Sequence, residues 1–199
     1  MKRSILLFSL TVLSFSLFAQ DIKLPEPQKE GGMPLMEALS LRQTTREFSS
    51  KELCPQTLSN LLWAAYGFNR EDKRVVPSAN NRQAFDVYVI LEKGAYLYDA
   101  KENTLILKKE GDFRSSAGRQ NFVAIAPVNL IYVADLGKTN GETARVDCGF
   151  IAQNVYLFCA SEKLGTVVRG WFDKDELHQL LNLTEQQEVI LTQTVGYNP

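Results

Sequence analysis

The sequence is poor in the residues that build metal centres and hydrolytic sites. Its 199 residues include three cysteines and one histidine, and no two cysteines are spaced as Cys-x-x-Cys. A structural zinc site needs four Cys or His ligands, and a Ser-His-Asp triad needs a positioned histidine. We therefore expect neither a metal site nor a histidine-based triad, and we place the single histidine, His178, on a helix surface.

The chain also lacks an excess of charge of either sign. It has 22 basic and 23 acidic residues, which leaves a net charge of −1. Nucleic acids and acidic membranes attract proteins through basic surfaces, so we expect no nucleic-acid partner. With 45% hydrophobic and 23% charged residues, the composition is that of a globular protein.

Three cysteines are too few for a disulfide framework. Cys148 and Cys159 fall on one predicted helix, and the helical rise separates them by about 16 Å. A disulfide requires its Cα atoms to lie within about 7 Å of each other. Cys54 could pair with one of the two, but free, buried thiols are the default expectation.

The first 19 residues have the pattern of a signal peptide. Lys2 and Arg3 precede an apolar run, Ile5–Phe18, that only Ser and Thr interrupt, and Ala19 is a plausible cleavage point. The run is too short for a comfortable transmembrane span. We expect an exported protein, periplasmic or secreted, after cleavage near Ala19.

Residues 20–33 follow as a flexible leader, because two prolines and two glycines interrupt them and no apolar period appears. Residues 34–199 are predicted to form a single domain. Their patterns predict an α+β fold with a central, mainly antiparallel sheet packed by helices. The predicted helices are 34–42, 55–66, 112–121, 142–163 and 174–181, and the predicted strands are 86–91, 96–99, 104–108, 127–134, 166–172 and 188–195. Residues 67–83 are predicted to be a loop, and Asp173 to cap the last helix.

The helix at 142–163 is apolar on almost all sides, which is typical of a buried helix. It is either a central core helix or a helix shared with a second subunit.

Two arginines, Arg42 and Arg46, stand four residues apart with Thr44 and Thr45 between them. Guanidinium groups match phosphate bidentately, and hydroxyls can satisfy further phosphate oxygens. The stretch can equally be a solvated basic helix end, which the helix dipole favours. Pro77–Gln83 is likewise either a solvated connection or a loop that presents amides to a planar polar ligand.

Together these stretches resemble the nitroreductase family of flavoproteins. Arg42–Arg46 is similar to its R-x-S/T-x-R/K opening, and Pro77–Gln83 to its P-S-x-x-N-x-Q loop. Asp147–Asn154 resembles its central helix, Leu164–Asp173 its G-L-G and G-x-F-D segment, and Val195–Tyr197 its closing V-G-Y.

The resemblance spans about residues 34–197 and is closest to the branch with the flavin-dependent azoline dehydrogenases of the SagB type. It implies a nitroreductase-like fold and a homodimer that shares FMN at its interface. The flavin would carry the chemistry, so no side chain is expected to be catalytic. The implied cofactor-binding residues are Arg42, Gln43, Thr44, Arg46, Pro77, Ser78, Ala79, Asn81, Gln83, Val168, Arg169, Gly170 and Trp171.

The resemblance also implies a role for each group of residues. Arg42 and Arg46 would hold the phosphate and the ribityl tail or ring edge, with Gln43 and Thr44 between them. Asn81 would reach the isoalloxazine ring. Pro77–Ala79 would pack on the flavin bound mainly by the other subunit, and Val168–Trp171 would run along the ring with a backbone N–H near N5.

Two departures from the family pattern bear on the site. No Lys or Arg follows Lys174, where many members end in a basic tail that contacts the phosphate. Arg169 stands where a carboxylate is common. It could face the pyrimidine end and stabilise the reduced flavin, or it could be a surface arginine.

The expected function is that of an exported FMN-dependent oxidoreductase that cycles its flavin between a reductant and a small organic substrate. Because reduced nicotinamides are cytoplasmic, a periplasmic or membrane electron carrier is an expected partner. The alternative is a non-catalytic exported domain of the same fold that binds a small aromatic ligand or a protein partner.

Overall fold

A computed structural model describes residues 20–199, and its centre is a seven-stranded sheet. The strand order is β1-β6-β5-β4-β7-β9-β8, and every neighbouring pair is antiparallel. The strands are β1 Ile22–Lys23, β4 Phe85–Leu91, β5 Gly94–Asp99, β6 Thr104–Glu110, β7 Val128–Asp135, β8 Leu164–Arg169 and β9 Gln187–Tyr197. The predicted α+β class with a mainly antiparallel sheet is therefore confirmed.

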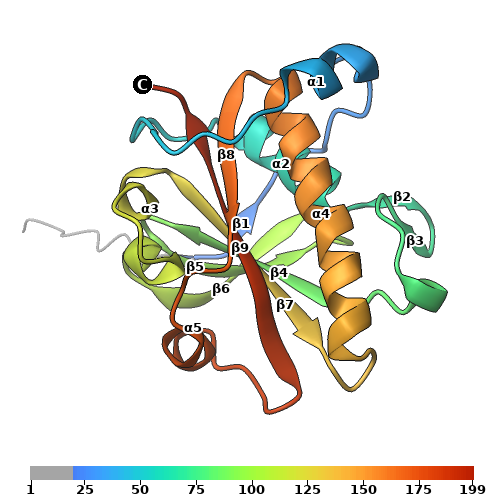
Figure 1. Ribbon diagram of the computed structural model, residues 1–199, viewed down its shortest axis with the longest axis vertical. Coiled ribbons are helices and arrows are strands. Elements are labelled where there is room, and N and C mark those ends of the chain that lie inside the picture. Colours follow the sequence, from blue (N-terminus) through green and yellow to red (C-terminus); the bar gives the residue numbers. More distant parts are fainter. Residues whose placement is uncertain (1–19) are drawn as a thin grey trace, which may run out of the picture.

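Helices cover both faces of the sheet, which explains why β4 and β7 are apolar at nearly every position (Figure 1). The helices are α1 Leu35–Leu41, α2 Pro55–Tyr66, α3 Phe122–Ile125, α4 Gly141–Ser161 and α5 Lys174–Leu180. On one face, Leu61 of α2 and Ile151 of α4 pack in one core with Leu130 of β7. On the other face, Leu177 of α5 packs with Ile131 of β7.

Local signals fix the helix ends. Pro55 begins α2 and Gly67 follows its last residue, as the sequence predicts. Asn140 caps α4 through a hydrogen bond from the Thr143 N–H to its side chain at 2.8 Å. Asp173 caps α5 in the same way by accepting from the Glu176 N–H at 3.0 Å, so the predicted cap is confirmed.

Two predicted segments differ from the structure. Residues 67–83, predicted as loop, contain the short hairpin β2 Phe68–Arg70 and β3 Lys73–Arg74 and the 3₁₀ turn η1 Ala79–Asn81. Residues 112–121, predicted as helix, contain only the 3₁₀ turn η2 Arg114–Ala117, and α3 begins later. The helix is interrupted at Gly118, where the backbone is extended and lies against the Arg169 guanidinium.

The expected flexible leader is instead packed onto the sheet in its first part. Ile22 and Lys23 pair with Leu105 and Thr104 of β6, so β1 forms an edge of the sheet. Leu24 is 4% exposed and belongs to the main core. A strand of two residues is too short to show a period, which is why the sequence pattern did not reveal it.

The predicted signal peptide lies outside the described residues. Among residues 20–199, no helix has both the length and the apolar character that crossing a membrane requires.

The packing of the leader gives a first testable prediction. Leu24→Ala should lower the free energy of unfolding by about 2–4 kcal/mol, because it removes buried methyl groups and leaves a cavity. Urea denaturation measures the change. The exposed Glu30 of the same leader is the control, and Glu30→Ala should stay within about 0.5 kcal/mol. A Leu24→Ala protein as stable as that control would show that the leader does not contribute to the core.

Candidate functional site

The arginine stretch lies at the β8 edge of the sheet. Helix α1 ends before Arg42, whose backbone N–H still donates to the Ala38 carbonyl at 2.9 Å. The backbone is extended from Arg42 onward. Thr45 donates its N–H to the Thr166 carbonyl at 2.9 Å, which ties the stretch to β8. Arg42 is half-buried, whereas Arg46 is exposed. The stretch is therefore an extended segment beside the sheet edge as well as a helix end.

Tyr156 of α4, which no sequence motif indicated, joins this stretch to β8. Its hydroxyl accepts the Val168 backbone N–H at 3.1 Å and lies 3.1 Å from Thr44 Oγ1. The Arg42 guanidinium lies 5.4 Å from the centre of its ring. A tyrosine on an otherwise apolar helix face was the only available signal, because both partners are distant in the sequence.

Tyr156 lines a surface pocket of about 210 Å³. Gln43 and Thr166 line this pocket. Lys163 and Asn198, which no sequence motif indicated, line it as well. Amide, hydroxyl and ammonium groups can donate hydrogen bonds to the oxygens of a phosphate or a ribityl chain. The predicted phosphate side of the site is therefore chemically consistent with an anionic ligand.

The Pro77–Gln83 loop is held by its own side chains and by α4. Asn80, Asn81 and Gln83 adopt left-handed backbone conformations, with φ between 49° and 53°. The Gln83 amide accepts from Arg74 Nε of β3 at 3.1 Å and donates to Asn81 Oδ1 within the loop at 3.1 Å. The Ala79 N–H donates to the Asp147 carboxylate at 3.3 Å.

Within the chain, the two groups of predicted residues are not brought together. Asp147 anchors the loop and Tyr156 anchors the arginine stretch, and the two residues lie nine positions apart on α4. The helical rise separates them by about 13 Å. Pro77 and Ala79 instead border a shallow, mainly apolar hollow with Val146 and Phe150. The chain thus carries two separate groups of candidate residues, here called half-sites.

The Val168–Trp171 segment is partly buried and partly open. Gly170 and Trp171 are exposed, and Trp171 is 65% accessible. Arg169 is only 5% exposed, so the surface alternative for this residue is wrong. Its guanidinium donates to the Ala117 carbonyl at 2.9 Å and to Asn129 Oδ1 at 3.0 Å, and burial lowers its pKa to about 10.

The cysteines and the histidine lie outside these half-sites. Cys148 and Cys159 are buried free thiols, as predicted, and burial raises the pKa of both. Cys54 is exposed instead, and hydrogen bonds from Thr57 lower the pKa of its thiol. His178 is half-buried on α5. In the described part of the chain, no three His, Cys, Asp or Glu side chains are grouped as metal ligands.

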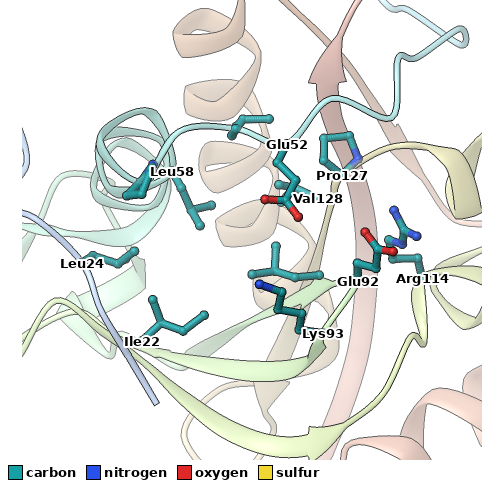
Figure 2. Close-up of a pocket in the computed structure, with 12 residues that line it drawn as sticks. Ile22, Leu24, Glu52, Leu58, Glu92, Lys93, Arg114, Pro127 and Val128 are labelled. Atoms are coloured by element: carbon teal, nitrogen blue, oxygen red, sulfur yellow. The ribbon is translucent and has the colours of Figure 1, made fainter. Parts of the chain in front are cut away.

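The cavity in Figure 2, of about 230 Å³, contains none of the predicted site residues. Its apolar wall comes from the leader, α2 and the start of β7, with Ile22, Leu24 and Leu58 opposite Pro127 (Figure 2). Charged side chains also line it: Glu52, Glu92, Lys93 and Arg114. Arg114 is already paired with Asp112 at 2.7 Å.

Comparison with known proteins gives consistent matches. The model of the nitroreductase family matches residues 39–197. A protein of Methanocaldococcus jannaschii, provisionally named a nitroreductase, is 33% identical over an alignment of 183 residues, and the match covers 83% of this chain and 91% of the relative.

Solved structures agree with that match. A crystal structure of a provisionally named nitroreductase from Ralstonia eutropha has a TM-score of 0.85 and 42% identity, with 92% of this chain and 91% of that chain covered. A chain of the Escherichia coli microcin synthetase McbBCD complex shares the fold at 17% identity, with a TM-score of 0.70 and coverage of 97% and 85%.

Proposed function

The chain belongs to the nitroreductase family, and from this premise we propose that it is an exported, FMN-dependent oxidoreductase that acts on a small organic substrate. Members of the family generally use FMN. The observation that carries the proposal is the convergence of Arg42, Thr44 and the Val168 backbone on the Tyr156 side chain at the β8 edge. This convergence brings together side chains that can donate hydrogen bonds to a phosphate and the backbone of a strand.

The residues of this half-site fit FMN. The Arg42 guanidinium is held over an aromatic ring, so less side-chain freedom is lost when it binds a phosphate. Gln43 and Thr44 present exposed polar groups next to it, and Arg46 adds a second, exposed cation. Val168–Trp171 would lie along the ring. A Cβ placed on Gly170 would have no atom within 4 Å apart from those of its chain neighbours, so the space at this position is open.

We propose that a second copy of the chain completes the site. Because the half-sites lie about 13 Å apart along α4, one flavin would contact the arginine stretch of one subunit and Pro77–Ala79 and Asn81 of its partner. Large apolar side chains are exposed on α1 and α4, where an interface would cover them. They are Leu35, Met36, Leu39, Leu41, Val146 and Phe150.

Bound FMN would supply the electron-transfer chemistry, so no side chain needs to be a catalytic acid or base. The protein's own residues would bind and orient it. Arg42 and Thr44 would hold the phosphate end, and the backbone after Val168 would position the ring. The exposed Trp171 ring stands at the edge of this segment, where it would border a bound substrate.

The Figure 2 cavity is the one observation that favours the alternative function. Its apolar wall would suit a small aromatic ligand, and it is separate from the residues that would hold FMN. A non-catalytic binding domain would use this cavity and would leave the β8 edge without a flavin.

An absorbance spectrum separates the two functions. We expect the purified protein to be yellow, and Arg42→Ala to weaken FMN binding by about 1.5–3 kcal/mol, the strength of a charge-assisted hydrogen bond. Titration of apoprotein with FMN measures the loss. Lys101→Ala, at a turn near the far edge of the sheet, is the control and should bind as the wild type does. A colourless protein that takes up no added FMN would contradict the proposal.

Assembly is tested by a charge placed on the exposed face of α4. Phe150 is 41% exposed on that face, and Phe150→Glu would bury an unpaired carboxylate at the proposed interface. We expect the wild type to be a homodimer and this variant to be a monomer by light scattering. Lys108→Glu, on the exposed end of β6, should remain dimeric. A folded wild-type monomer would remove the shared site.

Export bears on the source of electrons. Reduced nicotinamides are cytoplasmic, so we propose that an exported protein would take electrons from a periplasmic or membrane carrier, or oxidise an exported substrate. In anaerobic stopped-flow, reduced nicotinamides should bleach the bound FMN slowly and without saturation. Rapid, saturable bleaching at micromolar donor would defeat this part of the proposal, and a quinol is the matched donor for comparison.

A further inference from the structure

Arg169 carries a buried positive charge that no carboxylate balances. In residues 20–199, none of the ion pairs that the structure forms involves it, and burial lowers its pKa. Its hydrogen-bond partners are two neutral oxygens, the Ala117 carbonyl and Asn129 Oδ1, and the uncharged Phe122 ring has its centre 5.9 Å from the guanidinium. Its Nε is buried and has no hydrogen-bond partner among the described residues.

Such an arrangement is unfavourable for stability alone. Removing a cation from water carries a large penalty, and an apolar side chain of similar size often stabilises a core as well or better. The chain nevertheless makes room for the guanidinium. A Cβ on Gly118 would lie 1.8 Å from Arg169 Nη1 and 3.0 Å from Gln120 Oε1, which is also buried without a partner.

The charge is also rigidly placed. Asn129, which accepts from Arg169, accepts from Thr194 Oγ1 at 2.6 Å and donates to the Val123 carbonyl at 2.9 Å. These bonds tie the guanidinium to β7, β9 and α3. The Arg169 backbone, by contrast, stands between Val168, which Tyr156 fixes, and the exposed Gly170. The backbone of Arg169 therefore belongs to the strand segment that would run along the flavin, and its fixed guanidinium lies behind that segment, against Gly118.

Resting on the proposed function, we propose that Arg169 supplies the positive charge that stabilises reduced FMN relative to oxidised FMN. When two electrons and one proton enter the neutral oxidised ring, the ring gains one negative charge. A buried cation acts strongly on such a charge because little water screens it, and its position requires no rearrangement. The missing counter-charge of Arg169 would then be the charge that appears on the cofactor during reduction.

Three substitutions separate this role from a purely structural one. Arg169→Gln removes the charge, and Arg169→Lys keeps it. Gln120→Glu leaves Arg169 in place but adds a carboxylate beside it, and no hydrogen bond of the Gln120 side chain is lost. The measurement is the midpoint potential of bound FMN, by anaerobic reduction with dithionite in the presence of mediator dyes. Arg119→Gln is the control, because that guanidinium is exposed and paired with Asp173.

We expect Arg169→Gln and Gln120→Glu each to weaken the binding of reduced FMN about tenfold more than the binding of oxidised FMN. For a two-electron couple this corresponds to a potential lower by about 30 mV. Arg169→Lys and Arg119→Gln should stay close to the wild type. If Arg169→Gln does not fold, Gln120→Glu decides the question alone.

A Gln120→Glu protein with the midpoint potential of the wild type would overturn the inference. So would an Arg169→Lys protein whose potential shifts as much as that of Arg169→Gln. Both results leave the proposed function intact, because FMN is still bound. A wild-type protein that binds no FMN in either redox state would instead overturn the proposed function, and with it this inference.

Discussion

The packing of α4 on the sheet is the constraint on which the rest of the site depends. Cys148, Ile151, Val155 and Cys159 recur every three or four residues and bury one face of the helix in the main core. Burial of that stripe fixes both the rotation and the axial position of the helix. The polar anchors at Asp147 and Tyr156 are therefore held at a set spacing, and the segments that bind to them are positioned by the core.

Several buried polar side chains gather around β8 and β9. On the α4 side, Tyr132 donates to Gln193 at 2.7 Å, and Gln193 donates to Thr166 Oγ1 at 3.1 Å. On the opposite side, Asn129 joins Thr194 and Arg169. A buried polar network requires a specific geometry, because each unpaired member is costly. Gln120 Oε1, which is unpaired, and the guanidinium of Arg169, whose Nε is unpaired, lie beside the same glycine, Gly118.

Much of the fold could be predicted from local patterns. The meander from β4 to β6, the buried strand β7 and the helices α2 and α4 each show their period, cap or turn within one segment, and the structure contains them. Features that depend on distant partners could not be predicted. β1 exists because β6 offers it an edge, and the helix expected at 112–121 is interrupted where the guanidinium of Arg169, about fifty residues later, lies against Gly118.

The sequence by itself determined the family, through motifs whose residue types and order can be read without coordinates. It also determined which residues are candidates for binding FMN. Only the tertiary structure decided how these residues are grouped: Tyr156 joins Thr44 to Val168, Asp147 holds the Ala79 loop at a distance, and Arg169 is buried rather than exposed. The physical reason is that a hydrogen bond or a buried charge depends on which segments the core brings into contact, and residues tens of positions apart carry no local sign of that contact.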